Sequence, residues 1–255
     1  ETGQRVLLID LAGKQGDLAK QFGLWGDVQS ELAAEDDWPN ISTVFKDEWS
    51  QVATTLGDEA IDGLIKSTAE GPDLIPAHPG LDGLDGELNQ IDDVQDRYSR
   101  LDAFLTEYID PLGYDLILID LPGLTNNITY NGLWAAGSVV APVEMGPFEA
   151  DQTEQLQRDI ETFNDALDRH IELVMVIANK FDTRTKLDSE YLQQFSDEYT
   201  DAMAPEPVPK SQDIRNAADD GETIFARDEP SATASAARDA FETNASELLS
   251  RLTHE

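Results

Sequence analysis

Four continuous runs of apolar residues recur along the chain and predict its main strands. The runs lack the alternation of apolar and polar positions that marks a strand with one face in water. Continuous runs are typical of strands that are covered on both faces, as in a parallel sheet. The four runs lie at 5–10, 114–120, 138–143 and 172–178, and a weaker strand is expected at 73–76.

Segments with helical patterning separate the expected strands. Alternating strands and helices predict an α/β fold with a doubly wound, mostly parallel sheet. No repeat or low-complexity linker interrupts the pattern, so we expect a single domain over residues 1–255. The expected helices cover 47–68, 88–109, 150–169, 189–202 and 230–252.

The charge of the chain is strongly unbalanced, with 52 Asp and Glu against 17 Lys and Arg and a net charge of −35. The acids occur on every segment, so the chain repels itself in dilute salt. At molar salt the screening length falls to about 3 Å and the repulsion largely disappears. We therefore expect a cytoplasmic protein of a halophilic archaeon or bacterium; the alternative is an ordinary acidic protein. Cysteine is absent, which excludes thiolate metal sites, and no apolar stretch is long enough for a transmembrane helix.

Polar residues follow three of the expected strands directly: Asp10, Asp120 and Asn179. In doubly wound sheets, ligands bind beyond the carboxyl ends of the strands. Asp120 is followed by Pro122 and Gly123, which place a carboxylate beside a tight turn. In phosphate-binding α/β proteins such an acid holds Mg²⁺ and the next loop senses the terminal phosphate. The alternative is a strand that ends in an ordinary Pro-Gly turn.

The motif "NKFD" at 179–182 indicates a second possible function. Asn-Lys-x-Asp after a buried strand is the arrangement by which GTPases recognise guanine, because the Asp carboxylate accepts two N–H bonds from the base. Asp182 would have that role here. A GTPase therefore stays open as an alternative, beside the simpler reading of a polar loop.

The pair Gly13-Lys14 is not a phosphate-binding loop. The pattern G-x-x-x-x-G-K-[ST] requires Ser or Thr after the Lys and a Gly five positions before the second Gly. Here those positions hold Gln15 and Leu8, and no other Gly-Lys pair occurs in the chain. The opening "ETGQ" has the pattern of a helix end with Gly3 as a left-handed cap. We therefore expect the natural protein to carry a strand and a Gly-rich phosphate loop before Glu1.

Five segments, in order across nearly the whole chain, carry a family resemblance. They are "GQRVLLIDLAGKQGD", "PDLIPAHPGLDGLDGEL", "YDLILIDLPGLTNNITYNGLWAAGSVVAPVE", "VMVIANKFDTRTKL" and "VPKSQDIRNAADDGETI". Together they resemble the ParA/MinD family of partitioning ATPases, which are P-loop NTPases with a deviant Walker loop. Each segment alone is a weak match, and their common order makes the resemblance specific.

The resemblance implies a Rossmann-like three-layer fold and an ATPase that binds ATP and Mg²⁺ and forms a homodimer on binding. It implies that Asp120 holds Mg²⁺, with Gly123 in the adjoining loop, and that Asp10 supports the phosphate pocket. Asn179 and Pro209 would border the base. The role of the family in chromosome or plasmid partitioning implies DNA and an activating protein as possible partners.

The sequence departs from the family pattern in the first loop. The family's Asp-x-Asp is Asp10-Leu11-Ala12 here, and one extra residue lies near Lys14. The resemblance gives the second Asp the task of positioning the attacking water, which Ala12 cannot perform. Either Asp17 replaces it as a catalytic group beside Asp10, or hydrolysis is slow. A nucleotide-binding scaffold that does not hydrolyse is therefore a third hypothesis.

Two surfaces known in the family are poorly supported by this chain. A DNA-binding stripe would need clustered cations, and the acidic, Ala-rich C-terminal segment lacks the basic face of a membrane-binding helix. The candidate cations for DNA are scattered among acids: Lys186, Lys210, Arg215, Arg238 and Arg251.

Overall fold

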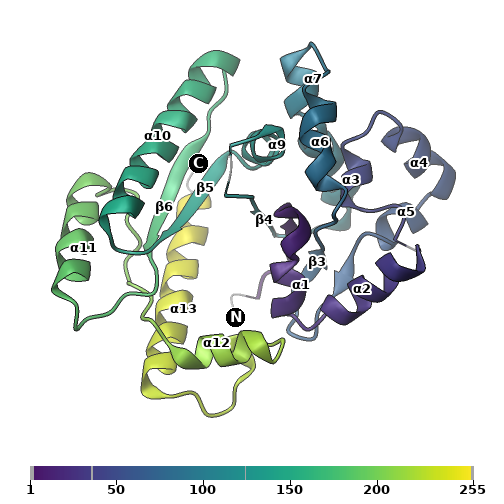
Figure 1. Cartoon of the computed structure of the whole chain (residues 1–255). Coiled ribbons are helices and arrows are strands. Elements are labelled where there is room, and N and C mark those ends of the chain that lie inside the picture. Colours follow the sequence, from purple (N-terminus) through teal and green to yellow (C-terminus); the bar gives the residue numbers. More distant parts are fainter. Residues whose placement is uncertain (1–2, 36, 124, 254–255) are drawn as a thin grey trace. The chain divides into compact units, whose positions relative to one another are not determined.

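The computed structural model describes residues 3–35, 37–123 and 125–253 of the chain. Strands and helices alternate along it in a mixed α/β structure (Figure 1). Over these described ranges, no helix combines the length and the apolar character needed to cross a bilayer.

Contacts group the chain into two compact units. The N-terminal unit holds Gly3–Ala136 together with Ala218–Thr223, and the C-terminal unit holds Gly137–Ala217 and the chain from Ile224 onward. The expectation of a single domain over residues 1–255 stays a prediction.

The sheet of the N-terminal unit has the strand order β2-β3-β1-β4. β1 (Val6–Asp10) lies between β3 (Asp73–Ile75) and β4 (Leu116–Asp120) and is parallel to both. β2 (Lys66–Ser67) pairs antiparallel with β3 at one edge. The sheet is therefore mostly parallel, as the sequence predicts.

Nine α-helices lie in the described part of this unit, with two short 3-10 helices at Gly13–Gln15 and Asp110–Leu112, and a π-helical segment, Leu105–Ile109, continues the eighth α-helix. The helices are α1 (Asp17–Gln21), α2 (Trp25–Ala34), α3 (Ile41–Val44), α4 (Trp49–Leu56), α5 (Glu59–Asp62), α6 (Leu81–Leu88), α7 (Val94–Tyr98), α8 (Arg100–Phe104) and α9 (Asn127–Ala136).

β1 is covered on both faces, because successive side chains of a strand point to opposite sides of the sheet. Leu7 and Ile9 are fully buried in a cluster with residues of α4, α6 and α8. Leu8 packs on the other side with Ala19 of α1 and Trp25 of α2. Burial of both faces explains why the sequence of β1 is continuously apolar.

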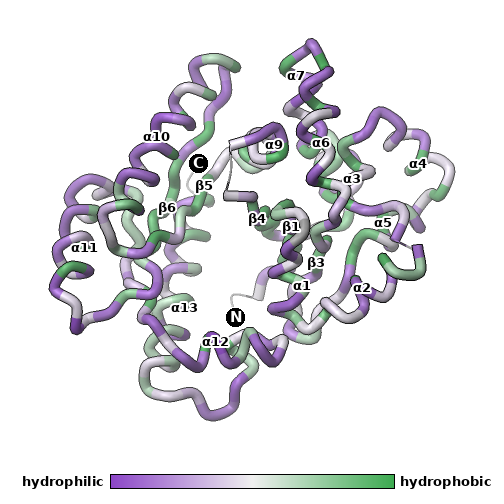
Figure 2. The backbone as a smooth tube through the Cα atoms, in the orientation of Figure 1, coloured by the Kyte–Doolittle hydropathy of each residue, from purple (hydrophilic) through white to green (hydrophobic). Residues whose placement is uncertain are grey.

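The C-terminal unit is built on two parallel strands, β5 (Ser138–Val143) and β6 (Glu172–Ala178). Val176 and Ala178 of β6 pack with Phe195, whereas Met175 packs with Leu248, so β6 is also covered on both faces. Figure 2 shows a hydrophobic β6 beside a mainly hydrophilic α10. The helices are α10 (Pro147–Leu167), α11 (Lys186–Glu198), α13 (Ala232–Leu252) and α12 (Gln212–Asp219), whose last residues are grouped with the N-terminal unit.

All five strand predictions are confirmed, and three of the five helix predictions are confirmed with ends shifted by a few residues. The expected helix at 47–68 is wrong. Gly57, with φ of +60°, ends α4, and Gly63 ends α5. The segment then turns into β2 instead of continuing as a helix.

The expected helix at 88–109 is also wrong over 89–93: Leu88 ends α6, and the chain becomes helical again at Val94, where Asp93 caps α7. The five predicted ranges also leave out the short helices α1 and α3 and the longer α2, α6, α9 and α12. The α6 segment, "LDGLDGEL", contains two glycines and is nevertheless helical, because Leu81, Leu84 and Leu88 bury one face in the core.

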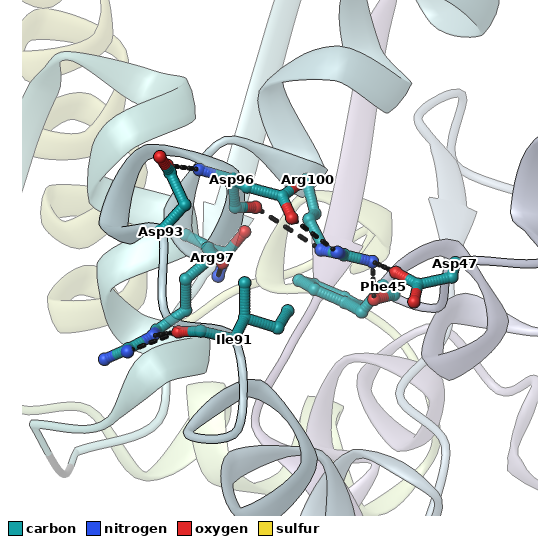
Figure 3. Close-up of polar contacts among 8 residues, drawn as sticks. Phe45, Asp47, Ile91, Asp93, Asp96, Arg97 and Arg100 are labelled. Carbon is teal, nitrogen blue, oxygen red and sulfur yellow. Dashed lines mark hydrogen bonds and ion pairs between the residues drawn. The ribbon is translucent and has the colours of Figure 1, made fainter.

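Hydrogen bonds and ion pairs of two arginines connect the loops around α7 and α8 (Figure 3). The Arg100 side chain is only 12% exposed; its Nη1 lies 2.6 Å from an Asp47 oxygen and donates to the Phe45 carbonyl. Its Nη2 lies 3.2 Å from Asp96 Oδ2, and Arg97 donates to the Ile91 carbonyl. These contacts hold the loop before α4 against α7 and α8.

Candidate functional site

The two predicted aspartates meet at the carboxyl edge of the N-terminal sheet. Asp10 ends β1, Asp120 ends β4, and the strand register places one opposite the other. The Leu11 N–H donates to the Asp120 carbonyl over 2.9 Å, so the pairing continues one residue beyond the strands. This is the edge at which open α/β sheets bind ligands.

Asp10 is fully buried. Its Oδ1 accepts the Ala12 N–H at 2.9 Å, but Oδ2 makes no hydrogen bond to any described residue; the Leu18 amide faces the carboxylate without completing one. Burial raises the pKa of Asp10, and the charge of Asp17 adds to the rise, while the Ala12 and Leu18 amides and Lys20 oppose it. An ionised Asp10 thus lacks a full set of compensating partners.

Asp120 projects from the exposed end of β4. Surrounding protein still desolvates part of the carboxylate, which raises its pKa, and the charges of Asp10 and Asp17 raise it further. Three carboxylates therefore lie close enough to influence one another. A bound cation would relieve this repulsion.

A cleft of about 670 Å³ opens beside these groups in the N-terminal unit. Among the lining residues that the structure describes, four are aspartates and none is Lys or Arg. The four are Asp17, Asp82, Asp85 and Asp120. A phosphate group would enter such a cleft only together with cations, since like charges repel strongly where water is partly excluded.

The loop after β1 forms one wall of the cleft and contains the departure from the family pattern. Ala12 lines the cleft and contributes no polar side-chain atom. Gly13 has φ of +72°, and a Cβ atom at this position would lie 2.8 Å from Asp82 Oδ1, so the loop needs a glycine there. Asp17, at the start of α1, also lines the cleft; its side chain is 63% exposed and lies 3.1 Å from Lys20 Nζ.

The loop after β4 forms another wall. Pro122 and Gly123 line the cleft, and Leu124 lies outside the described residues. Asp85 of α6 fixes the following helix, because its Oδ1 accepts hydrogen bonds from both the backbone N and Nδ2 of Asn127, each at 2.8 Å. Asp82 and Asp85 were not predicted from the sequence, and their spacing on a leucine-patterned helix is the signal that could have found them.

The other predicted residues lie together in the C-terminal unit. Asn179 follows β6, and its N–H donates to the Val143 carbonyl at 2.7 Å. Phe181 forms a parallel bridge with Pro209, with hydrogen bonds to Val208 and from Lys210. The fold thus brings 179–182 beside Pro209, two segments that are distant in the sequence.

The carboxylate of Asp182 is occupied by a residue of its own loop. Its Oδ1 accepts hydrogen bonds from the Arg184 N and Nε at 3.0 and 2.8 Å, and its Oδ2 accepts from Nη2 at 2.6 Å. These bonds lower the pKa of Asp182 well below its usual range. Arg184 was not predicted as a site residue, because nothing in its spacing indicates which carboxylate it meets.

Two of the five candidate DNA-binding cations serve the fold instead. Arg238 donates to the carbonyls of Ile224 and Arg227, and Arg251 donates to those of Val174 and Met203. Lys186 forms an ion pair with Glu190. A DNA surface built on these five residues is therefore left with Lys210 and Arg215 as its main cations.

Comparison with known proteins identifies the family of the chain. A family model described as an AAA domain matches residues 1–173. The chromosome partitioning protein ParA of Caulobacter vibrioides is 30% identical over 216 residues, which cover 82% of this chain and 72% of that protein. The chain belongs to the ParA/MinD family.

Solved structures agree with this ParA/MinD assignment. Cobyrinic acid a,c-diamide synthase from Mycobacterium smegmatis, solved with ADP and magnesium bound, is 25% identical with a TM-score of 0.62, over 82% of this chain and 76% of that one. McdA from Cyanothece has a TM-score of 0.69 at 16% identity, covering 94% and 88% of the two chains, and shows the same fold. The α/β, mostly parallel fold expected for the family is thereby confirmed.

The carboxylates of this ParA/MinD member fit a magnesium ion that also binds phosphate. Mg²⁺ takes hard oxygen ligands and usually keeps several waters, so one or two carboxylates and the phosphates of the substrate suffice. Among the described residues, no group of three or more His, Asp or Glu side chains forms a complete protein-only metal site. The arrangement of Asp120 beside the unpaired oxygen of Asp10 therefore suits a metal that arrives with a nucleotide.

Proposed function

We propose that this protein is a ParA-type nucleotide-dependent ATPase that acts in chromosome or plasmid partitioning or in intracellular positioning. Asp120 holds Mg²⁺, Asp10 supports the phosphate pocket, and Gly123 lies in the loop that responds to the terminal phosphate. Asn179 and Pro209 border the base. The relatives support this proposal, because they include partitioning ATPases.

One observation carries the proposal: the in-register pairing of the buried Asp10 with Asp120, which lines an acidic cleft. Burial raises the pKa of both carboxyls, the charge of Asp17 adds to the rise at each, and the charge of Asp10 further raises the pKa of Asp120. A bound divalent cation would compensate both the desolvation of these carboxylates and the repulsion between their charges. It would also neutralise the acidic cleft so that a triphosphate can bind there. When bound, Mg²⁺ supplies charge neutralisation for the phosphates.

The hydrolytic step is assigned to Asp17. Ala12 has no group that could orient water, whereas Asp17 lines the same cleft with an exposed carboxylate. Its distance to Lys20 Nζ is that of an exposed ion pair, which opens at little cost in free energy. A scaffold that binds ATP without hydrolysis is the second candidate, and Ala12 is the residue that favours it.

The wider proposals concern partners and setting. A nucleotide-dependent homodimer and an activating partner protein are in keeping with the family. DNA binding has the least structural support of these proposals, because Arg238 and Arg251 already bind backbone carbonyls within the fold. The charge of −35 supports a halophilic, cytoplasmic protein.

The test is equilibrium binding of ATP to the full-length protein in concentrated KCl, with and without Mg²⁺. We expect Mg²⁺-dependent binding that Asp120→Ala abolishes, because the cation loses its carboxylate. Asp92→Ala removes an exposed carboxylate away from the cleft and should bind like the wild type. If Asp120→Ala binds ATP as the wild type does, the proposed site is in the wrong place.

A further inference from the structure

The loop at 179–185 combines a guanine-recognition pattern with an internal arginine that occupies it. In the Asn-Lys-x-Asp pattern, the Asp accepts one hydrogen bond from each of two N–H groups of guanine, so both carboxylate oxygens must face the base. In this protein both oxygens of Asp182 accept hydrogen bonds from Arg184. The pattern is therefore present in sequence and blocked in structure.

The block is a bidentate pair with additional support from the backbone. Planar guanidinium groups match carboxylates with two parallel N–H bonds, which are stronger than single neutral hydrogen bonds. The Arg184 backbone N–H adds a third bond to Oδ1, and the Asp182 N–H donates to Asp188 Oδ2 at 3.0 Å. Contacts within the loop thus fix both the carboxylate and the backbone of Asp182.

Adenine does not need this carboxylate. Its hydrogen-bonding edge presents an amino donor beside a ring-nitrogen acceptor, and it lacks the paired N–H donors of guanine. An Asp182 neutralised by Arg184 therefore excludes the contact that would favour guanine and leaves adenine unaffected. The cost to guanine is the loss of its two charge-assisted bonds, because a base cannot displace Arg184 without breaking the pair.

We propose that Arg184 determines base specificity in this protein. It occupies both carboxylate oxygens of Asp182, which guanine would otherwise use, so the nucleotide site prefers ATP to GTP. This inference rests on the proposed function, since it requires Asn179 and its loop to border the base. It assigns Arg184 a specificity role and requires no part in the chemical step.

The expected change in nucleotide selectivity follows from the exposure of the Arg184 side chain. The Arg184 side chain is 87% exposed, and exposed ion pairs contribute little to free energy, so opening the pair should change nucleotide selectivity by about two- to five-fold. Salt screens exposed charges, so the effect should be larger at the lowest KCl concentration at which the protein stays folded.

The experiment compares dissociation constants of Mg-ATP and Mg-GTP for the full-length wild type, Arg184→Ala, and the double variant Arg184→Ala with Asp182→Ala. Arg184→Ala should tighten GTP binding by about two- to five-fold while ATP binding changes less than about twofold. The double variant should lose the gain for GTP. Lys186→Ala is the matched control, because it removes one exposed cation two positions away that pairs with Glu190 and not with Asp182.

The outcomes separate the inference from the proposed function. If the wild type binds ATP and Arg184→Ala leaves the ATP-to-GTP ratio unchanged, Arg184 only stabilises the loop and the inference is wrong. A GTP gain that persists in the double variant would also overturn it, because the gain would not pass through Asp182. If the wild type binds neither nucleotide, the proposed function itself fails.

Discussion

Replacing Asp10 by Asn should change how the stability of the protein depends on pH. The folded state raises the pKa of Asp10 above its ordinary value of 3.8. Between that value and the folded pKa, the native chain keeps a proton that the unfolded chain has lost. The free energy of unfolding contributed by Asp10 therefore falls as pH rises through this window. Asn does not titrate, so the variant lacks this loss.

The magnitude follows from the burial of the unpaired oxygen. Leaving a buried polar atom unsatisfied costs about 1–3 kcal/mol, and a pKa shift of one unit corresponds to about 1.4 kcal/mol. We expect the difference in unfolding free energy, Asp10→Asn minus wild type, to rise by about 1–3 kcal/mol between about pH 4 and pH 8. Any cost of burying the Asn amide is the same at each pH and does not affect this rise.

Denaturant unfolding in concentrated KCl, without nucleotide or Mg²⁺, measures the difference at each pH. Asp92→Asn is the control, because it removes one negative charge at an exposed position and reports the relief of general repulsion alone. If the free energy of unfolding of Asp10→Asn changes with pH in parallel with that of the wild type or of the control, Asp10 is not a buried carboxylate that lacks a compensating cation.

Three further predictions follow from the structure and the composition. Arg100→Ala should lower the free energy of unfolding by about 1.5–3 kcal/mol, whereas Arg158→Ala, which breaks an exposed pair with Glu154, should lower it by less than about 0.5 kcal/mol; equal losses would refute the role of burial. Ala12→Asp adds a second carboxylate that can orient water and should speed single-turnover ATP hydrolysis, by less than the about 10²–10⁴-fold that a well-placed base contributes alone, because Asp17 already supports the reaction. An unchanged rate would mean that position 12 does not face the attacking water. The melting temperature should rise steadily from about 0.1 M to about 3 M KCl, and a flat profile would remove the halophilic interpretation.

The strands and their terminal acids could be predicted because burial on two faces leaves a direct trace in the sequence. A strand such as β1 must be apolar at consecutive positions, and its run ends where Asp10 reaches the carboxyl edge. Once the strands are parallel, the meeting of Asp10 and Asp120 follows from their order. The grouping of Asp10 with Asp120 was therefore accessible from the pattern alone, whereas that of Asn179 with Pro209 was implied only by the family resemblance.

The helices were harder to predict because tertiary contacts decide where they break. Helical spacing of apolar residues continues past Gly57 and Gly63, yet the positive φ of Gly57 ends α4 and the pairing of Lys66–Ser67 with β3 turns the chain into a strand. Conversely, no helix was predicted over α6, whose two glycines have a poor helical propensity, and core contacts of Leu84 override that propensity. Side-chain pairings such as Asp182 with Arg184 depend on loop geometry, which local sequence does not specify.

The mass of the full-length protein in solution, measured by light scattering with and without Mg-ATP, tests the central claim most directly. In the proposed function two copies join when nucleotide and metal are bound, so we predict the monomer mass without nucleotide and twice that mass with Mg-ATP. Asp120→Ala should keep the monomer mass in both conditions. A wild-type mass that stays unchanged when Mg-ATP is bound would contradict the account of this protein as a nucleotide-dependent switch.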